Sequence, residues 1–263
     1  FDPEKLSFRA RWRGGFVKLS SARHGFASGP AVGGKTFAQE KNPVLPKDAR
    51  YLGFYRHGEE VIFAYEQEGR RRLMSAWQTD EAILEKLTQG GPKRWSKELT
   101  TPITRGEQKP FAVDTIGVPF ENPYGALFFI SGIDFLPDGA AAVSTMTGEV
   151  WLVRGLAGDQ AVWRRYATGL HQALGVKVVD GKVLVLGRDQ ITRLHDTNGD
   201  GEADYYECVT NDYPTDAGNN FALTLHQDDD GALYWFTRSA NFGMTRWAPG
   251  GKPQSIATGL RGT

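Results

Sequence analysis

The stretch that decides the fold is Gly175-Val-Lys-Val-Val-Asp-Gly-Lys-Val-Leu-Val-Leu186. Two short runs rich in valine and leucine flank an Asp-Gly pair, and this pattern predicts two antiparallel strands joined by a tight turn. A third run, Gln190-Ile-Thr-Arg-Leu194, follows after a short loop. The whole unit is therefore predicted to be strand, Asp-Gly turn, strand, loop, strand.

The same unit occurs two more times in the second half of the chain. Asp138-Gly139 and Asp230-Gly231 each lie between two apolar runs, as Asp180-Gly181 does, so the turns are 42 and 50 residues apart. The tetrapeptide Ala-Thr-Gly-Leu occurs at 167–170 and again at 257–260, where it marks the end of a fourth strand. A repeat of about 40–50 residues has the size of a four-stranded propeller blade.

We therefore expect an all-β protein in which a partial β-propeller of four-stranded blades follows an N-terminal β-rich domain. The expected boundaries are 1–112 for the N-terminal domain and 113–263 for about three blades. Closed propellers have about 4–8 blades, so we expect an incomplete propeller that is part of a longer polypeptide. An antiparallel sandwich whose hairpins share Asp-Gly turns is the alternative.

Two elements are expected in the N-terminal half. Residues 51–66 predict a hairpin that turns near His57-Gly58. Residues 79–90 are the best helix candidate, with Thr79 or Asp80 as the cap and Gly90 at the end. An edge strand or a surface loop would fit this second segment nearly as well.

Composition excludes several classes of function. The chain has 31 basic and 31 acidic residues, which gives no electrostatic case for a nucleic-acid partner. No apolar run approaches the roughly 18–20 residues that span a bilayer, so no transmembrane segment is predicted. The single cysteine, Cys208, excludes an intrachain disulfide. Cys-x-x-Cys-His, His-Glu-x-x-His and nucleotide-binding fingerprints are absent, so we expect no haem or catalytic zinc in this chain.

Residues 196–207 have the ligand pattern of a twelve-residue calcium loop. The predicted ligands are Asp196, Asn198, Asp200, Glu202 through its backbone carbonyl, Asp204 and Glu207. The flanking residues are typical of strands rather than of the helices of an EF-hand, so we expect a structural calcium ion on a β scaffold. An acidic surface turn without an ion is the alternative. Calcium loops of micromolar to millimolar affinity favour a periplasmic or extracellular location.

His171 is the most interesting histidine, because it lies where one predicted blade ends and the next begins. Such segments can face the central channel of a propeller, where a histidine could act as a general base. A structural, hydrogen-bonded histidine is an equal alternative. Arg188 and Asp189 form either a salt bridge or a polar patch on the ligand face, and His195 could orient the calcium loop. Trp151 and Trp247 occupy matching repeat positions and are expected in the core.

Several segments resemble a known group of proteins. The segment from His171 to Val185 is similar to a blade of the glucose/sorbosone dehydrogenase-like propellers. The segment from Gly187 to Asp204 resembles large secreted bacterial proteins that join an uncharacterised N-terminal β domain to such a propeller, often followed by cytochrome c. Trp12-Arg-Gly-Gly-Phe-Val-Lys-Leu19, Arg23-His-Gly25 and Gly53-Phe-Tyr-Arg-His-Gly58 resemble the N-terminal domain of that group.

The resemblance implies a quinoprotein-type dehydrogenase that oxidises a sugar or another alcohol and passes electrons to a cytochrome c domain or protein. In that case His171 would abstract the proton and Arg188 would contact the cofactor, pyrroloquinoline quinone. The alternative is a non-catalytic, calcium-stabilised module that binds glycans or proteins.

Overall fold

The fold is described from a computed structural model, which covers residues 5–8, 10–14, 17–18, 31–39, 48–107, 109–213, 221–237 and 243–259. In these ranges the chain forms 21 strands and one helix of seven residues. The all-β prediction is therefore confirmed. The segment Arg23-His-Gly25 lies outside the described residues.

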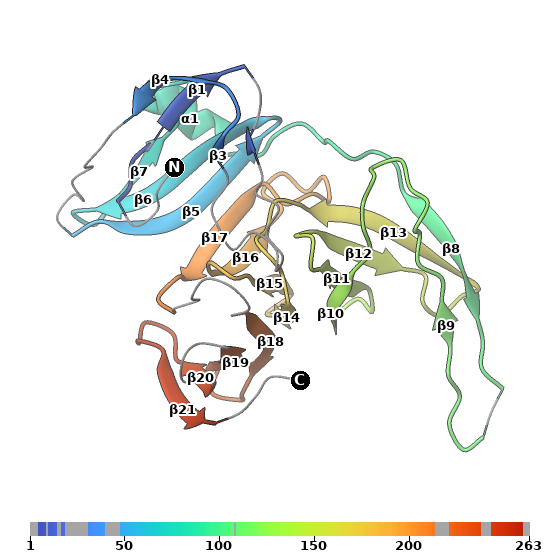
Figure 1. The fold of residues 1–263 in the computed structure, drawn as a ribbon. Helices are drawn as coiled ribbons and strands as arrows, with labels where there is room; N and C mark the ends of the chain where they lie inside the picture. Colours follow the sequence, from blue (N-terminus) through green and yellow to red (C-terminus); the bar gives the residue numbers. More distant parts are fainter. Residues whose placement is uncertain are drawn as a thin grey trace.

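Twelve of the strands form three successive antiparallel meanders of four strands each, which we call blades 1 to 3 (Figure 1). Blade 1 consists of β10 (Ile130–Phe135), β11 (Ala141–Thr145), β12 (Val150–Arg154) and β13 (Gln160–Ala167). Blade 2 consists of β14 (Gly175–Val179), β15 (Lys182–Leu186), β16 (Ile191–His195) and β17 (Tyr205–Thr210). Blade 3 consists of β18 (Ala222–Gln227), β19 (Leu233–Thr237), β20 (Gly243–Trp247) and β21 (Gln254–Thr258).

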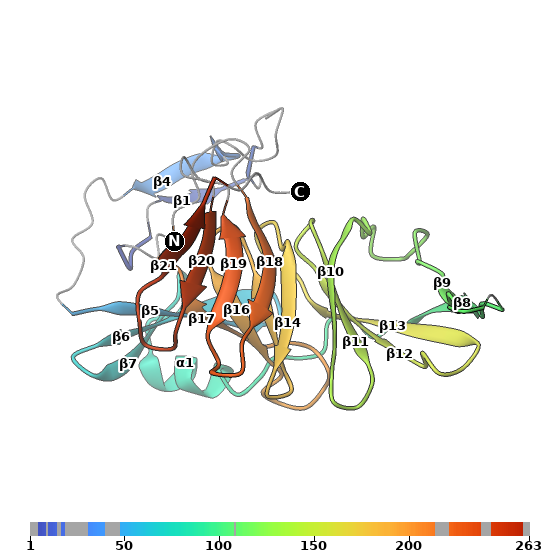
Figure 2. The same ribbon diagram turned by 90° about the horizontal axis from the view of Figure 1, so that it is seen from below.

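The first strand of each blade lies at the centre of the assembly. Strand β14 contacts both β10 and β18, and the three strands stand side by side in Figure 2. The other strands of each blade lead outward from this centre (Figure 1). This radial arrangement is a partial propeller, as predicted, and not a sandwich. The Asp-Gly turn of blade 2 has φ values of 50° at Asp180 and 70° at Gly181, as a two-residue hairpin loop requires.

Apolar side chains fill the space between neighbouring blades. Between blades 1 and 2 the cluster includes Leu152, Val185 and Tyr206, and between blades 2 and 3 it includes Leu186 and Trp235. Trp151 is fully buried and Trp247 is 9% exposed, so both tryptophans belong to the core as predicted. Contact between blades therefore buries two large apolar clusters of this fold.

Strands of the N-terminal half extend two of the blades. The hairpin of β5 (Arg50–His57) and β6 (Glu60–Gln67), followed by β7 (Arg70–Met74), pairs with β17 and gives a seven-stranded sheet. Strand β8 (Leu99–Thr104) pairs with β13, and β9 (Thr115–Ile116) completes a six-stranded sheet. The predicted hairpin is confirmed. The domain boundary after residue 112 stays a prediction, with strands from both sides of it sharing sheets.

Gly53 explains how β5 can approach β17 so closely. Its φ is +122°, and a Cβ atom at this position would lie 2.0 Å from the carbonyl oxygen of Tyr206. Only glycine combines this backbone conformation with this space. The seven-stranded sheet therefore depends on a residue that lacks a side chain.

The predicted helix is present as α1 (Glu81–Leu87). Asp80 caps its start, because its side chain accepts hydrogen bonds from the backbone N–H groups of Ala82 and Ile83. No helix among the described residues is long and apolar enough to cross a membrane. The remaining strands form two small sheets, β1 (Ala10–Arg13) with β4 (Lys35–Gln39) and β2 (Val17–Lys18) with β3 (Ala31–Val32).

Candidate functional site

Blade 2 has two ends, which carry different loops. Because its strands are antiparallel, the segment 168–174 and the loop 187–190 lie at one end, which we call the upper end. The Asp-Gly turn and the loop 196–204 lie at the opposite, lower end. The predicted catalytic and cofactor residues are thus at the upper end, and the predicted metal ligands begin at the lower end.

Hydrogen bonds join the two segments of the upper end. The backbone N–H of Arg188 donates to the carbonyl oxygen of His171 at 2.8 Å, and that of Leu174 donates to Leu186 at 3.0 Å. The hydroxyl group of Tyr213 donates to the carbonyl oxygen of Gly187 at 2.9 Å. The fold therefore brings His171 and Arg188 together, although 16 residues separate them in the sequence.

His171 and Asp189 form an electrostatically coupled pair at this end. Burial lowers the pKa of His171, while the negative charge of Asp189 acts in the opposite direction. Burial also raises the pKa of Asp189, and the positive charge of His171 opposes that shift. Asp189 is an exposed residue and His171 is half-buried. Two titratable groups with opposed shifts at one end of a blade are candidates for acid–base chemistry.

The absence of a side chain at Gly187 leaves space for the carboxylate of Asp189. A Cβ atom at Gly187 would lie 2.7 Å from Oδ1 of Asp189 and 3.2 Å from the carbonyl oxygen of His171. Any side chain at Gly187 would therefore displace the carboxylate of Asp189. The sequence analysis considered Asp189 together with Arg188 and did not predict its coupling to His171, which lies in the preceding loop.

Arg188 has the contacts of a supporting residue. Its side chain is buried, and Nη1 donates to Oε1 of Gln172 at 3.1 Å. The guanidinium group also lies 5.5 Å from the ring centre of Phe221. An anionic quinone would need exposed cationic groups, and the guanidinium group of Arg188 is buried and already engaged. These residues alone do not fit pyrroloquinoline quinone, and cofactor binding by Arg188 stays a prediction.

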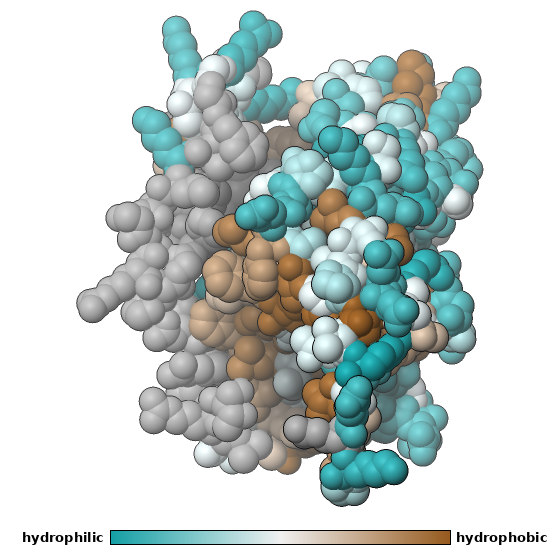
Figure 3. Space-filling view, turned by 90° about the vertical axis from the view of Figure 1, so that its right-hand side faces the viewer, coloured by the Kyte–Doolittle hydropathy of each residue, from teal (hydrophilic) through white to brown (hydrophobic). Residues whose placement is uncertain are grey.

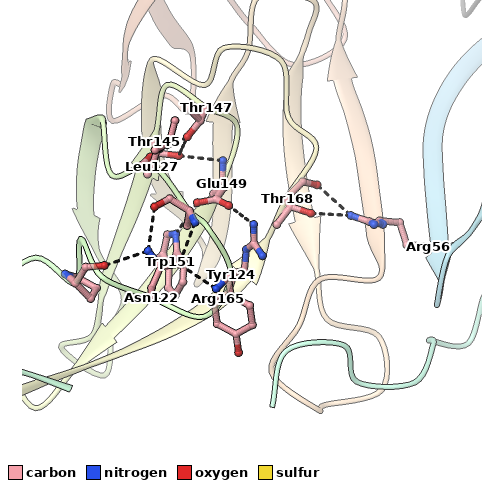
Figure 4. A network of polar contacts seen from close by, with 12 residues as sticks. Arg56, Asn122, Tyr124, Leu127, Thr145, Thr147, Glu149, Trp151, Arg165 and Thr168 are labelled. Carbon is pink, nitrogen blue, oxygen red and sulfur yellow. Dashed lines mark hydrogen bonds and ion pairs between the residues drawn. The ribbon is translucent and has the colours of Figure 1, made fainter. Parts of the chain in front are cut away.

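A partly buried polar network supports the upper end from the side of blade 1 (Figure 4). Arg56 of β5 donates through Nη1 to Oγ1 of Thr168 at 2.9 Å, which ties the seven-stranded sheet to the segment before His171. Nearby, Arg165 is ion-paired with Glu149 and lies 5.1 Å from a ring of Trp95. Sequence patterns gave no signal for this network, because its members come from distant parts of the chain.

At the lower end the structure divides the six predicted calcium ligands. Asp196, Asn198 and Asp200 lie together at the tip of the loop, where their side-chain oxygens accept backbone N–H groups of the same loop at 2.7–3.0 Å. Each of these oxygens keeps a further lone pair. The three side chains and the carbonyl group of Glu202 therefore fit the oxygen donors that calcium prefers.

Asp204 and the side chain of Glu202 have other partners. Oδ1 of Asp204 accepts the N–H of Gly91 at 2.9 Å, and its Oδ2 accepts the N–H and the hydroxyl group of Thr197, both at 3.0 Å. The carboxylate of Glu202 accepts the N–H groups of Arg94 at 2.8 Å and Trp95 at 2.7 Å. These two carboxylates hold the segment 91–95 against the loop.

Glu207 lies apart from the tip of the loop. It is the third residue of β17, and its carboxylate accepts Nη1 of Arg193 at 3.1 Å and contacts Nε2 of His195 at 2.7 Å. In an EF-hand a helix returns position 12 to the ion, whereas a strand moves about 3.3 Å further away with each residue. Among the described residues no three His, Cys, Asp or Glu side chains gather as a metal site. Calcium binding stays a prediction.

A cavity of about 430 Å³ lies between blade 2 and the β20–β21 turn, and sequence patterns did not predict it. Its wall combines the aromatic residues Tyr51 and Trp247 with the ion pair of Arg193 and Glu207 and the polar residues Asn211 and Asp212. The volume lies in the range of small-molecule sites.

Comparison with known proteins adds little to this geometry. Residues 1–73 match a domain of unknown function (DUF6797). No curated protein matches the sequence. The chain is similar to virginiamycin B lyase from Staphylococcus aureus at 15% identity and a TM-score of 0.39, over 80% of this chain and 73% of that chain. A catalytically inactive variant of that lyase with Quinupristin gives 14% identity and a TM-score of 0.37, over 84% and 73%. Likeness at this level has no bearing on activity.

Proposed function

We propose that this chain is part of a propeller that removes a proton from a hydroxyl group of a sugar or another alcohol. The observation that supports it is the pairing of His171 with Asp189 at the upper end of blade 2. A half-buried imidazole with a lowered pKa is neutral at pH 7 and can accept a proton through a ring nitrogen. The carboxylate of Asp189 would stabilise the imidazolium that forms.

The resemblance to the glucose/sorbosone dehydrogenase-like propellers supports oxidation as the overall reaction in a periplasmic or extracellular protein. Pyrroloquinoline quinone would then accept the hydride, and a cytochrome c domain or protein would receive the electrons. Residues beyond the described surroundings of His171 would have to hold the quinone, because Arg188 already contacts Gln172 and Phe221.

Dye-coupled oxidation of a panel of sugars and alcohols, in the presence of pyrroloquinoline quinone and calcium, tests the proposal. We expect His171→Ala to lower kcat by at least about 100-fold, which is the usual contribution of a general base. His226→Ala is the matched control, since His226 is exposed on β18. Equal activity of His171→Ala and the unmodified protein, or absence of turnover with every substrate, would refute the function.

The cavity beside Trp247 supports a second candidate function, which is binding of a glycan without catalysis. Sugar sites commonly combine an aromatic side chain with charged pairs that hydrogen-bond neighbouring hydroxyl groups, and the cavity offers both. Calorimetric titration with monosaccharides and oligosaccharides would detect such binding. Asp212→Ala should weaken it and His171→Ala should leave it unchanged, which separates the two candidate functions.

We further propose that Asp196, Asn198, Asp200 and the carbonyl group of Glu202 bind a structural calcium ion. The adjacent oxygens at the tip of the loop support this assignment. The ion would stiffen the link between β16 and β17 and would take no part in the chemistry at the other end of blade 2.

A further inference from the structure

The segment 171–174 at the upper end is fixed by hydrogen bonds from both neighbouring blades. The carbonyl oxygen of Ala173 accepts the hydroxyl group of Ser131 on β10, which belongs to blade 1. The carbonyl oxygen of Leu174 accepts the backbone N–H of Thr224 on β18, which belongs to blade 3, at 3.3 Å. The first strands of the three blades stand side by side here (Figure 2). The backbone of this segment is therefore held from two sides, in addition to its contacts within blade 2.

Gln172, in the middle of this segment, has a backbone conformation that glutamine rarely adopts. Its φ is +48°, in the left-handed region that L side chains disfavour. Thr224, whose N–H reaches the same segment, has a φ of +55°, which is an outlier for a β-branched residue. Glu68 and Asp180, by contrast, lie in hairpin turns, where positive φ values are ordinary. Strained residues persist only where their surroundings determine them, and they cluster at functional sites.

Arg188 bonds to both residues on either side of the peptide bond between His171 and Gln172. Its backbone N–H donates to the carbonyl oxygen of His171 at 2.8 Å, and its Nη1 donates to Oε1 of Gln172 at 3.1 Å. Arg188 and Gln172 are only 5% and 7% exposed, so their side-chain hydrogen bond forms away from water, where such bonds are stronger. The ring of Phe221 lies 5.5 Å from the guanidinium group. One buried arginine thus holds the strained backbone directly after His171.

We propose that Arg188 and Gln172 are positioning residues, whose hydrogen bond keeps the left-handed backbone at Gln172 and thereby fixes the direction of the imidazole of His171. This inference rests on the proposed role of His171 as the general base. Without the bond, residue 172 would relax to a negative φ and would turn the segment and the imidazole with it. A base has to lie within hydrogen-bonding distance of the proton that it removes, and a misplacement of about 1 Å can cost about 100-fold in rate.

Kinetics in the dye-coupled assay test this proposal. Gln172→Met removes the acceptor and keeps the length of the side chain, so kcat should fall at least about tenfold while KM changes less than about threefold. Arg188→Met should act in the same way, and the double variant should lie within about twofold of the weaker single variant, because both substitutions remove one bond. Thr192→Val is the matched control. It removes another buried side-chain hydrogen bond, from Gln190 at 2.8 Å, and should leave kcat unchanged.

Gln172→Asn separates positioning from folding. Asparagine adopts positive φ more readily than glutamine, but its shorter side chain withdraws the acceptor from Arg188. We therefore expect a Tm equal to or above that of the unmodified protein, together with the same fall in kcat as in Gln172→Met. A lowered Tm with normal kcat would show that Gln172 has only a structural role and would overturn the proposal.

NMR titration of the imidazole of His171 tests the positioning without any turnover. Burial lowers the pKa of His171, so loss of its fixed position in Gln172→Met, which removes no charge, should raise that pKa toward its ordinary value. Thr192→Val should titrate like the unmodified protein. An unchanged pKa in Gln172→Met would overturn the positioning role. Normal kcat in Gln172→Met beside an inactive His171→Ala would overturn only this inference, whereas full activity of His171→Ala would refute the proposed base itself.

Discussion

The two ends of blade 2 use their polar residues in opposite ways. At the lower end, each side-chain oxygen of Asp204 and Glu202 accepts a hydrogen bond from the protein, and four of the five donors are backbone N–H groups. At the upper end, the charges of His171 and Asp189 shift each other's pKa. Carboxylates with a full set of donors stabilise a fold, whereas coupled groups with shifted pKa values can exchange protons.

The largest effect should come from Asp204→Ala at the lower end. Its removal leaves the N–H groups of Gly91 and Thr197 and the Thr197 hydroxyl group without their acceptor, in a region where Asp204 is 5% exposed. We expect a loss of about 3 kcal/mol in the free energy of unfolding, measured by urea denaturation. Asp212→Ala is the control at an exposed carboxylate. Similar losses of unfolding free energy in both variants would contradict the conclusion that Asp204 holds residues 91–95 against this loop.

Calcium removal should give the second largest effect. At a calcium concentration 100 times the Kd, binding stabilises a protein by about 2.7 kcal/mol, so chelation should lower the Tm by several degrees. Asp200→Ala should abolish the response to chelation. Glu207→Gln should keep that response, because Glu207 lies beside His195 and Arg193. Loss of the calcium response in Glu207→Gln would instead show that Glu207 is a calcium ligand, as the twelve-residue pattern predicts.

Glu207 should contribute a smaller, pH-dependent effect. The hydrogen bond with His195, together with Arg193, lowers the pKa of Glu207 in the folded state below its ordinary value. The carboxylate therefore stabilises the fold above that ordinary value, and this contribution is lost as the pH falls through the lowered pKa. We expect at most about 1 kcal/mol, since the pair is partly exposed. Tm measured from pH 3 to 7 should show a smaller acid-induced drop in Glu207→Gln.

The smallest effect on stability should come from His171→Ala, at about 0.5 kcal/mol or less. The charge of Asp189 favours the protonated imidazole, so Asp189→Asn should lower the pKa of His171 further. Gly187→Ala should act in the same direction, because its Cβ displaces Oδ1 of Asp189. NMR titration of the imidazole from pH 4 to 8 measures this shift. A large stability loss in His171→Ala would instead identify the histidine as a structural residue.

Local patterns predicted the elements that depend on neighbours in the sequence. The Asp-Gly turns, the valine-rich strands and the cap at Asp80 are each set by residues within one hairpin or one helical turn, and all three were predicted correctly. The calcium pattern was assigned by spacing alone. It located Asp196, Asn198 and Asp200 beside one another, and it included Glu207 as the twelfth position on a predicted strand. The strand β17 at that point is what separates Glu207 from the tip.

The sequence by itself determined that the chain forms strands, where the strands turn, and that they repeat as blades, because strand and turn preferences act over a few residues. Only the tertiary structure decided that β5 and β8 extend the sheets of blades 2 and 1, that the loop with Asp189 bonds to the segment with His171, and that Asp204 holds residues 91–95. It also decided which apolar residues of blade 1 remain uncovered, on the side of the molecule that Figure 3 shows. These features join residues far apart in the chain, and their energies come from burial and desolvation, which exist only once the blades pack.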